Sequence, residues 1–242
     1  NVDIAPGYKK FTIKSGQKYT NAKLPDQTYF VEGDASSASY FLAAAAMTGG
    51  DLTVVGCGSS STQGDVRFAE VLKDMGARIE MNPTNITVVG GPAQLKGVDV
   101  DCLDIPDAAM TLASVALVAE GTTTIRNVGS WRVKETERMK AIVAETSKFG
   151  ADVTEQPTTC IIKPPTEIKP MCEIETYDDH RIAMTFALAA CAGVPVKILD
   201  PGCTSKTFPT YFKELSRVTL DADGRKRSSV RRLLAKLAFW KK

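Results

Sequence analysis

Histidine is scarce in this sequence, and no two of its cysteines have a metal-binding spacing. The 242 residues include one His and six Cys, and none of the cysteines forms a CxxC pair. Structural zinc sites need four closely spaced Cys or His ligands, so we expect no such site. Cys160 and Cys191 stand in apolar runs, where a free thiol packs as a small hydrophobic side chain. The pattern favours reduced thiols in an intracellular compartment.

The chain also lacks a long hydrophobic run. A membrane-spanning helix needs about 20 consecutive apolar residues. The longest apolar run here, residues 182–192, is interrupted by Thr185 and predicts a buried helix. Residues 1–10 contain no apolar signal segment. With 43% apolar and 24% charged residues, the composition is that of a globular protein with one large domain or two smaller ones.

The net charge of +2 hides an uneven distribution. Residues 219–242 contain eight Lys or Arg and two Asp, which gives this tail a charge of +6 and the rest of the chain −4. Val230, Leu233, Leu234 and Leu237 recur in the tail at the spacing of a basic amphipathic helix. Such a segment could bind a membrane surface, an acidic protein groove or nucleic acid, or it could be foreign to the native protein. We expect no nucleic-acid binding by the acidic body.

An internal repeat organises most of the sequence. Asp34, Asp107 and Asp179 each open an Ala-rich apolar stretch, and they are 73 and then 72 residues apart. An Asp at this position predicts a helix N-cap, and we expect the three helices to end at Gly49, Gly121 and Gly193. A strand-like run follows each helix: DLTVVG, TTTIRNV and VPVKIL.

The second half of each repeat is also similar. GDVRFAEVLKDMGA and ETERMKAIVAETSKFGA carry apolar residues at helical spacing and end in Gly-Ala. A pair of short strands follows each of them, and a further strand, such as TYFVEG, precedes each repeat. A third amphipathic helix is expected at residues 207–217. The fold class is therefore α/β (α+β), with three βαβαββ units whose apolar helices lie inside and whose sheets lie outside.

Residues 1–28 precede the first repeat. FTIKSG predicts one strand and AKLPDQ a turn or linker, so this segment offers no second strand for the first to pair with. We expect it to be the remnant strand and linker of another domain, followed by a repeat domain over residues 29–218 and the tail from 219.

Charged side chains gather at three places that we expect to be helix starts. These are IPDAAMT at 105–111, WRVKETER at 131–138, and the segment 177–208 with YDDHR and CTSKTF. Helix starts offer unpaired N–H groups and a positive dipole end to an anion. Together the segments predict a site for a phosphorylated, acidic small molecule, formed by four cations and two carboxylates: Lys134, Arg138, Arg181, Lys206, Asp107 and Glu135.

Six motifs resemble those of the EPSP synthases (3-phosphoshikimate 1-carboxyvinyltransferases) and occur in the same order. Their sequences are closest to those of plant and algal members. They cover residues 29–217 and read VEGDASSASYFLAAAA, QGDVRFAEVL, IPDAAMTLA, WRVKETERM, TYDDHRIAM and DPGCTSKTFPTYF. The resemblance implies transfer of the enolpyruvyl group of phosphoenolpyruvate to the 5-hydroxyl of shikimate 3-phosphate, in the shikimate pathway to aromatic amino acids. It implies no metal or other cofactor.

The same resemblance implies a fold of two similar domains with the active site between them. This chain would supply the C-terminal domain, and an N-terminal domain absent from the sequence would be its partner. We therefore expect the chain alone to be inactive. The sequences of the motifs also imply a location in the plastid stroma if the source is a plant or alga, and in the cytoplasm otherwise.

The resemblance assigns roles to individual positions. Asp107 would take the proton of the 5-hydroxyl, and Glu135 would exchange protons with the phosphoenolpyruvate methylene. Asp107, Ser130 and Lys134 would contact shikimate 3-phosphate. The three positions that would contact phosphoenolpyruvate are Arg138, Arg181 and Lys206.

Each assignment has a simpler structural alternative. Asp107 is also a typical N-cap. Lys134 and Glu135 stand four and three residues before Arg138, a spacing that places all three on one helix face, where Glu135 and Arg138 could be a solvated ion pair. We expect Asp179 to hold Arg181 in place, and we assign His180 no role. Two other functions stay open: a related enolpyruvyl transferase for a nucleotide sugar, and a non-catalytic module that docks to a separate N-terminal half.

Overall fold

The structure is a computed structural model that describes residues 2–18, 25–91 and 94–219. The chain divides into two compact units, Asn1–Glu32 and Gly33–Lys242, and each is described by itself. All but the first residue of the expected tail lies outside the described residues. Within the described residues, no helix is long and apolar enough to cross a membrane.

The smaller unit contains a strand pair. β1 (Val2–Ile4) pairs antiparallel with β2 (Phe11–Ile13), and the 3₁₀ turn η1 (Pro6–Tyr8) joins them. Gly7 adopts φ 69° in this turn, which favours glycine because it has no Cβ. The strand expected in FTIKSG is confirmed, but the expectation that it has no partner is wrong. A second short turn, η2, spans Pro25–Gln27.

The first repeat of the larger unit has an interior helix, a covering helix and three antiparallel strands in the order β3-β5-β4. Its elements are α1 (Ala35–Thr48), β3 (Leu52–Val55), η3 (Gly64–Arg67), α2 (Phe68–Asp74), β4 (Arg78–Met81) and β5 (Asn85–Val89). The strand expected in TYFVEG is absent from the described residues 28–33. Tyr29, Phe30 and Val31 are exposed there. Gly33, at the end of the segment, donates its N–H to Gly56 O (2.8 Å), and its carbonyl accepts from Gln63 Nε2 (2.8 Å).

The second repeat shows the full βαβαββ order. Its elements are β6 (Asp99–Asp101), η4 (Ala108–Thr111), α3 (Leu112–Val118), β7 (Thr123–Arg126), η5 (Gly129–Val133), α4 (Arg138–Lys148), β8 (Asp152–Glu155) and β9 (Cys160–Lys163). Their strands form one sheet in the order β6-β7-β9-β8, and β6 and β7 are parallel. This confirms the repeat unit and the antiparallel strand pair at its end.

Within the described residues, the third repeat ends with its second helix. It consists of β10 (Cys172–Ile174), α5 (His180–Ala187), η6 (Leu188–Ala190), β11 (Val196–Ile198), η7 (Pro201–Lys206) and α6 (Tyr211–Val218). β10 and β11 pair in parallel, as β6 and β7 do in the second repeat. The last helix begins at Tyr211 rather than at 207, so Pro209 lies ahead of it instead of in its first turn.

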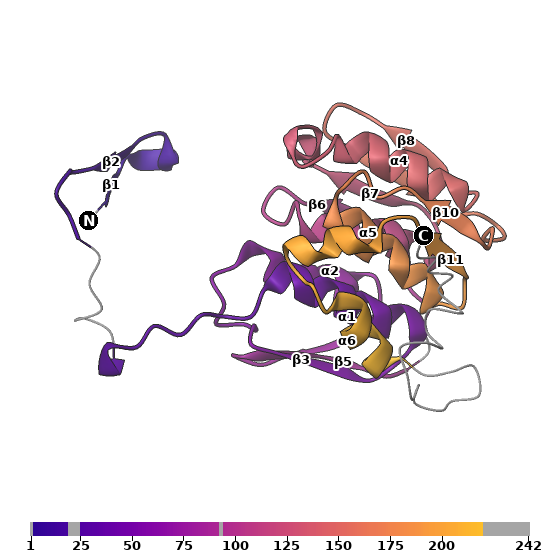
Figure 1. Cartoon of the computed structure of the whole chain (residues 1–242), viewed down its shortest axis with the longest axis horizontal. Coiled ribbons are helices and arrows are strands. Elements are labelled where there is room, and N and C mark those ends of the chain that lie inside the picture. Colours follow the sequence, from indigo (N-terminus) through magenta and orange to yellow (C-terminus); the bar gives the residue numbers. More distant parts are fainter. Residues whose placement is uncertain (1, 19–24, 92–93, 220–242) are drawn as a thin grey trace. The chain divides into compact units, whose positions relative to one another are not determined.

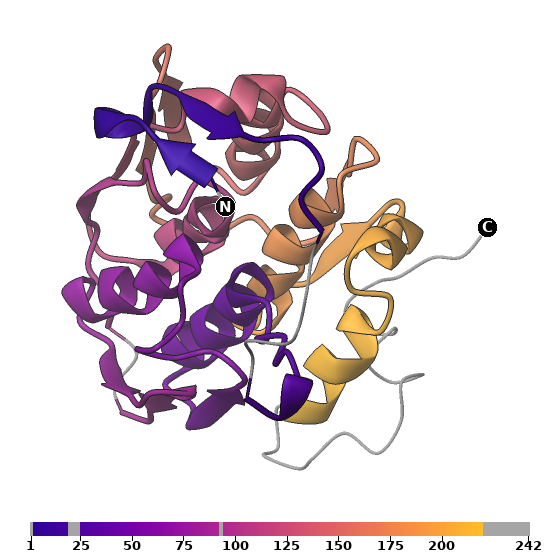
Figure 2. The ribbon, with the colours of Figure 1, turned by 90° about the vertical axis from the view of Figure 1, so that its left-hand side faces the viewer.

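The three apolar helices form the core of the larger unit. α3 contacts both α1 and α5, and almost all the side chains of the three helices are buried. The sheets of the first two repeats lie at opposite margins, with helices between them (Figures 1 and 2). Ser39 Oγ lies 2.8 Å from Thr111 Oγ, and Ser114 Oγ donates to the carbonyl of Thr185 at 2.6 Å. These bonds join equivalent helices of successive repeats, and the expected interior position of the helices is confirmed.

The helix ends follow the sequence signals only in part. Asp34 caps α1 by accepting from Ser36 N and Ser37 N, and Gly49 ends it with φ 68°. α3 and α5 end at Val118 and Ala187, before the glycines expected to end them. α3 ends because its C-cap, Ala119, takes up extended backbone angles, and α5 tightens into the 3₁₀ turn η6.

Candidate anion-binding site

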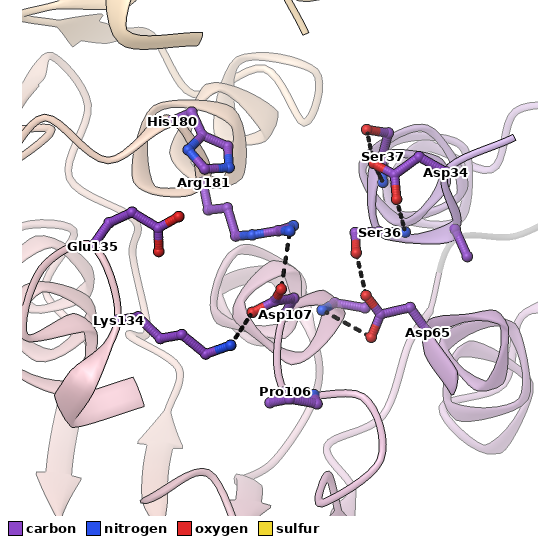
Figure 3. Close-up of polar contacts among 12 residues, drawn as sticks. Asp34, Ser36, Ser37, Asp65, Pro106, Asp107, Lys134, Glu135, His180 and Arg181 are labelled. Carbon is purple, nitrogen blue, oxygen red and sulfur yellow. Dashed lines mark hydrogen bonds and ion pairs between the residues drawn. The ribbon is translucent and has the colours of Figure 1, made fainter. Parts of the chain in front are cut away.

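Asp107 lies at the meeting point of three cations from two other segments. Its Oδ1 is 3.0 Å from Arg138 Nη1 and 3.5 Å from Lys134 Nζ, and its Oδ2 is 3.0 Å from Arg181 Nη2. Figure 3 shows Lys134 and Arg181 approaching this carboxylate from two sides. Asp107 precedes η4, but its side chain makes no capping hydrogen bond there. Its carboxylate therefore forms ion pairs with the cations and does not cap the helix.

Arg138 is the buried centre of the cluster. Its side chain is 1% exposed, and its guanidinium contacts Asp107, Glu135 and Asp179. Nη2 lies 2.7 Å from Glu135 Oε2, and Nε lies 2.7 Å from Asp179 Oδ2. A guanidinium has five N–H donors in a fixed plane, so one buried Arg can hold three carboxylates in a set geometry.

Glu135 is also bound by a cation from the third repeat. Lys206 Nζ donates to its Oε1 at 2.9 Å, although the two residues are 71 positions apart. Burial alone would raise the pKa of Glu135, but the Lys206 hydrogen bond, a backbone hydrogen bond and the charges of Arg138 and Lys206 lower it to about 2. Glu135 is therefore ionised at neutral pH in this structure.

The segment that carries Lys134 and Glu135 is not helical. α4 begins at Arg138, with Glu137 as its cap, so the expected shared helix face of residues 134, 135 and 138 is wrong. Lys206 likewise ends η7 instead of preceding a helix directly. The side chains converge nevertheless, because the ion pairs of Arg138 and Lys206 draw the three segments together.

Asp179 supports a different arginine from the one expected. Its carboxylate is fully buried and binds Arg138 through Nε and Nη2, at 2.7 and 3.3 Å. From Arg181 it accepts only the backbone N–H, at 2.9 Å, as the cap of α5. The guanidinium of Arg181 points instead to Asp107 (Figure 3). Asp179 thus orients Arg138 and starts the helix that carries Arg181.

Two further residues of interest lie beside the cluster, and one of them, His180, has its Nδ1 3.7 Å from Asp179 Oδ1. Ser130 is exposed in η5, next to Trp131, whose Nε1 donates to the carbonyl of Pro106 at 2.6 Å. That bond fixes the segment of Ser130 beside the residue before Asp107. His180 is buried, and burial lowers its pKa. Among the described residues, neither of its ring nitrogens has a hydrogen-bond partner.

The sequence reasoning missed Asp65 and Ser36. Ser36 Oγ donates to Asp65 Oδ2, and Asp65 Oδ1 accepts the N–H of Ala108 at 3.4 Å (Figure 3). Burial raises the pKa of Asp65. The bonds connect the start of α1 to the backbone next to Asp107. The QGD motif that contains Asp65 was the available signal.

An open pocket lies against the cluster. Its lining comes from three segments: Glu135, Asp178, Asp200, Gly202, Cys203, Ser205 and Lys206. The protein's own carboxylates neutralise the cations. A phosphate or carboxylate that entered could replace Glu135 at Lys206 and Asp107 at Arg181, because both kinds of oxygen accept charge-assisted hydrogen bonds. The arrangement is suited to binding an anion and to releasing two carboxylates for proton transfer.

No cluster of three or more His, Cys, Asp or Glu suited to a metal ion occurs in the described part of the chain. The same residues contain no disulfide.

Solved structures share the architecture of the larger unit. An EPSP synthase from Acinetobacter baumannii superposes with a TM-score of 0.65 at 28% identity, over 78% of this chain and 46% of that chain. The enolpyruvyl transferase NikO from Streptomyces tendae gives a TM-score of 0.56 at 18% identity, over 76% of this chain and 42% of that chain, which shows the fold alone. The fold is that of the enolpyruvyl transferases.

Sequence comparison narrows the class further. A family profile described as EPSP synthase (3-phosphoshikimate 1-carboxyvinyltransferase) matches residues 1–215. 3-Phosphoshikimate 1-carboxyvinyltransferase 2 of Nicotiana tabacum is 56% identical over 223 residues, 90% of this chain and 64% of that protein. The chloroplastic 3-phosphoshikimate 1-carboxyvinyltransferase of Arabidopsis thaliana is 55% identical over 225 residues, 90% of this chain and 42% of that protein. The 3-phosphoshikimate 1-carboxyvinyltransferase of Escherichia coli O1:K1 is 52% identical over 212 residues, 88% of this chain and 48% of that protein.

The chain belongs to the EPSP synthase family. It spans about half the length of the curated relatives it matches. The family and the fold class expected from the motifs are both confirmed.

Proposed function

We propose that this chain supplies one wall of an active site that transfers the enolpyruvyl group of phosphoenolpyruvate to the 5-hydroxyl of shikimate 3-phosphate. The observation that carries the proposal is the position of Asp107, within 3.5 Å of cationic nitrogens of Lys134, Arg138 and Arg181. A carboxylate held in this way has a fixed orientation, and the cations around it can be shared with an anionic substrate.

Asp107 is the proposed base. It takes the proton of the 5-hydroxyl while the oxygen bonds to the central carbon of phosphoenolpyruvate. The cationic side chains around Asp107 would also bind the substrates. Lys134, together with Ser130, would bind shikimate 3-phosphate, and Arg181 would bind phosphoenolpyruvate. Arg138 and Lys206 would complete the binding of phosphoenolpyruvate and stabilise the anionic intermediate.

Glu135 is the proposed proton donor to the methylene carbon. A carboxyl group with a pKa of about 2 is almost entirely deprotonated at neutral pH and is therefore a poor general acid. If Lys206 moves from Glu135 to the substrate phosphate, the largest pKa-lowering contact of Glu135 is lost, and its pKa rises. Substrate binding would thereby prepare Glu135 to deliver the proton. Return of that proton to Glu135 then accompanies cleavage of the carbon–oxygen bond and release of phosphate.

The opposite wall would come from an N-terminal domain. On this view residues 1–28 belong to that domain and the link to it, and residues 29–218 form the C-terminal domain. Closure of the two would exclude water from the cluster, so the chain alone should not turn over. Plant relatives named as chloroplastic support a plastid location for this protein.

The test combines the chain with the N-terminal half of a plant relative and measures phosphate release. We expect turnover only in the mixture, and Asp107→Ala should reduce kcat by about 10²–10⁴-fold, as for loss of a general base. Asp99→Ala is the matched control, because Asp99 of β6 forms an exposed ion pair with Arg126 of β7. Calorimetry of the chain with each substrate gives an independent readout. Full turnover with Asp107→Ala would remove this residue from the mechanism.

A further inference from the structure

A fully buried carboxylate lies outside the cluster and is used by none of the steps above. Glu145 lies in α4, seven residues after Arg138, so the two project from the same side of the helix two turns apart. Its side chain is 0% exposed. A carboxylate in such surroundings is stable only with hydrogen-bond partners, because burial removes its hydration.

Three donors bind Glu145, and two of them belong to the segment before α5. Oε1 accepts the hydroxyl of Tyr177 at 2.8 Å, and Oε2 accepts the N–H of Glu175 at 3.1 Å. The third donor is Lys148 Nζ at 2.6 Å, which also reaches the carbonyl of Glu173 at 2.8 Å. Burial, together with the hydrogen bond and charge of Glu145, raises the pKa of Tyr177 to about 12, so the hydroxyl keeps its proton.

The segment held in this way has an unfavourable backbone. Tyr177 and Asp178 both adopt left-handed angles, with φ 54° and 55°. A left-handed conformation costs a non-glycine residue on the order of 1 kcal/mol or more, and two in succession persist only when their surroundings hold them. The turn closes with a bond from Asp179 N to the carbonyl of Thr176 at 2.8 Å.

This turn delivers three groups to the cluster. Asp178 lines the pocket, Asp179 binds Arg138, and Arg181 follows at the start of α5 and reaches Asp107. α4 therefore holds the turn at two points. Arg138 binds it through Asp179, and Glu145, two helical turns later, binds it through Tyr177 and Glu175.

We propose that Glu145 and Tyr177 are positioning residues that hold the left-handed turn at 176–179 and so place Asp179 and Arg181 for the binding of phosphoenolpyruvate. Neither residue would contact a substrate. The inference rests on the proposed function for its ligand, while the restraint on the turn is a property of the chain itself.

The first test needs no substrate. Hydrogen exchange is measured on the full chain for Tyr177→Phe, which removes only the hydroxyl, and for Glu145→Gln, which keeps the shape. We expect exchange of amides 175–181 to accelerate about tenfold in each variant, as for the loss of one buried hydrogen bond, with α1 unchanged. Glu173→Gln is the matched control: this exposed carboxylate pairs with Lys197, and its backbone contact with Lys148 remains.

The second test uses the chain combined with its N-terminal half. Tyr177→Phe should raise KM for phosphoenolpyruvate about tenfold and change KM for shikimate 3-phosphate less than twofold, because Lys134 and Ser130 are not on the turn. A purely structural defect would move both constants or neither.

Unchanged exchange at 175–181 in Tyr177→Phe, or equal acceleration throughout the chain, would overturn the positioning role. So would an equal rise of both KM values. If the unsubstituted protein binds no phosphoenolpyruvate, the proposed function fails, and the exchange experiment alone decides whether the turn is held by Glu145. Should Glu145→Gln fail to fold, Tyr177→Phe decides the question.

Discussion

Arg138 Nε lies 2.7 Å from Asp179 Oδ2, and the two side chains are 1% and 0% exposed. The pair joins the second repeat to the third, because Arg138 begins α4 and Asp179 caps α5. Two charges removed from water stabilise a fold only while both are present, since the loss of one leaves the other unpaired. The contact with Asp179 also orients the guanidinium of Arg138, the cation that Asp107 and Glu135 share.

Asp179→Asn tests this pair. The amide can still cap α5, but the guanidinium of Arg138 loses its buried carboxylate and keeps only Asp107 and Glu135, so we expect a loss of about 2 kcal/mol in the free energy of unfolding. Urea denaturation measures it. Asp178→Asn is the stability control, because Asp178 is exposed and asparagine accepts its left-handed angle. Equal stability of the two variants would mean that the buried pair contributes nothing measurable.

The depressed pKa of Glu135 predicts a pH dependence. The folded-state value of about 2 lies below the ordinary 4.5, so Glu135 adds stability above pH 4.5 and loses that contribution as the pH falls toward 2. A shift of this size corresponds to about 3 kcal/mol, and solvent screening at this partly exposed group reduces our expectation to about 1–2 kcal/mol.

The measurement compares the original chain with Glu135→Gln by urea denaturation from pH 6 to pH 2.5. The difference in unfolding free energy between the two should be constant above about pH 5 and shrink below it. A difference that is independent of pH over this range would contradict the depressed pKa.

Lys206→Met tests the exchange of partners at the pocket. Removal of the ammonium group takes away a phosphate ligand, so KM for phosphoenolpyruvate should rise about tenfold or more in the combined protein. Lys197→Met is the matched control, since Lys197 forms a 2.6 Å ion pair with Glu173 away from the pocket. Similar kinetics for both variants would exclude Lys206 from substrate binding.

Gly49→Ala tests the end of the first interior helix. Gly49 has φ 68°, which alanine adopts only with strain, so we expect a loss of about 1 kcal/mol in unfolding free energy. Gly50→Ala is the control because an added Cβ there meets only Thr48 Oγ1 at 3.4 Å, an ordinary contact. If both variants lose the same stability, the left-handed cap is not the cause. Thermal unfolding of the two variants in parallel gives the comparison.

Local signals in the sequence predicted the elements that depend on local chemistry. The Asp caps of α1 and α5 and the terminal strand pairs β4–β5 and β8–β9 are where the repeats placed them. A capping side chain accepts hydrogen bonds from N–H groups no more than three residues away, and a short turn joins the strands of each pair. Residues close together in the sequence therefore suffice to predict these elements. The partner strand β1 was missed because three exposed residues form no periodic pattern.

The non-local contacts could not be read in the same way. Residues 134, 135 and 138 were expected on one helix face, yet only Arg138 is helical. The site depends on contacts between groups 27 to 74 residues apart, from Lys134 with Asp107 to Arg181 with Asp107. Spacing along the chain carries no information about such distances. Asp179 shows the consequence, because nothing in the order of the residues indicates which arginine its carboxylate binds.

The sequence by itself determined the family, the repeated unit and the identity of the charged side chains, because these are properties of residue order. Only the tertiary structure decided which carboxylate forms an ion pair with which cation, and that the pKa of Glu135 is lowered. It also decided that Glu145 accepts a hydrogen bond from Tyr177 in the turn before α5. The physical reason is that ion pairing and burial depend on distances in space, and packing three similar helices together sets those distances.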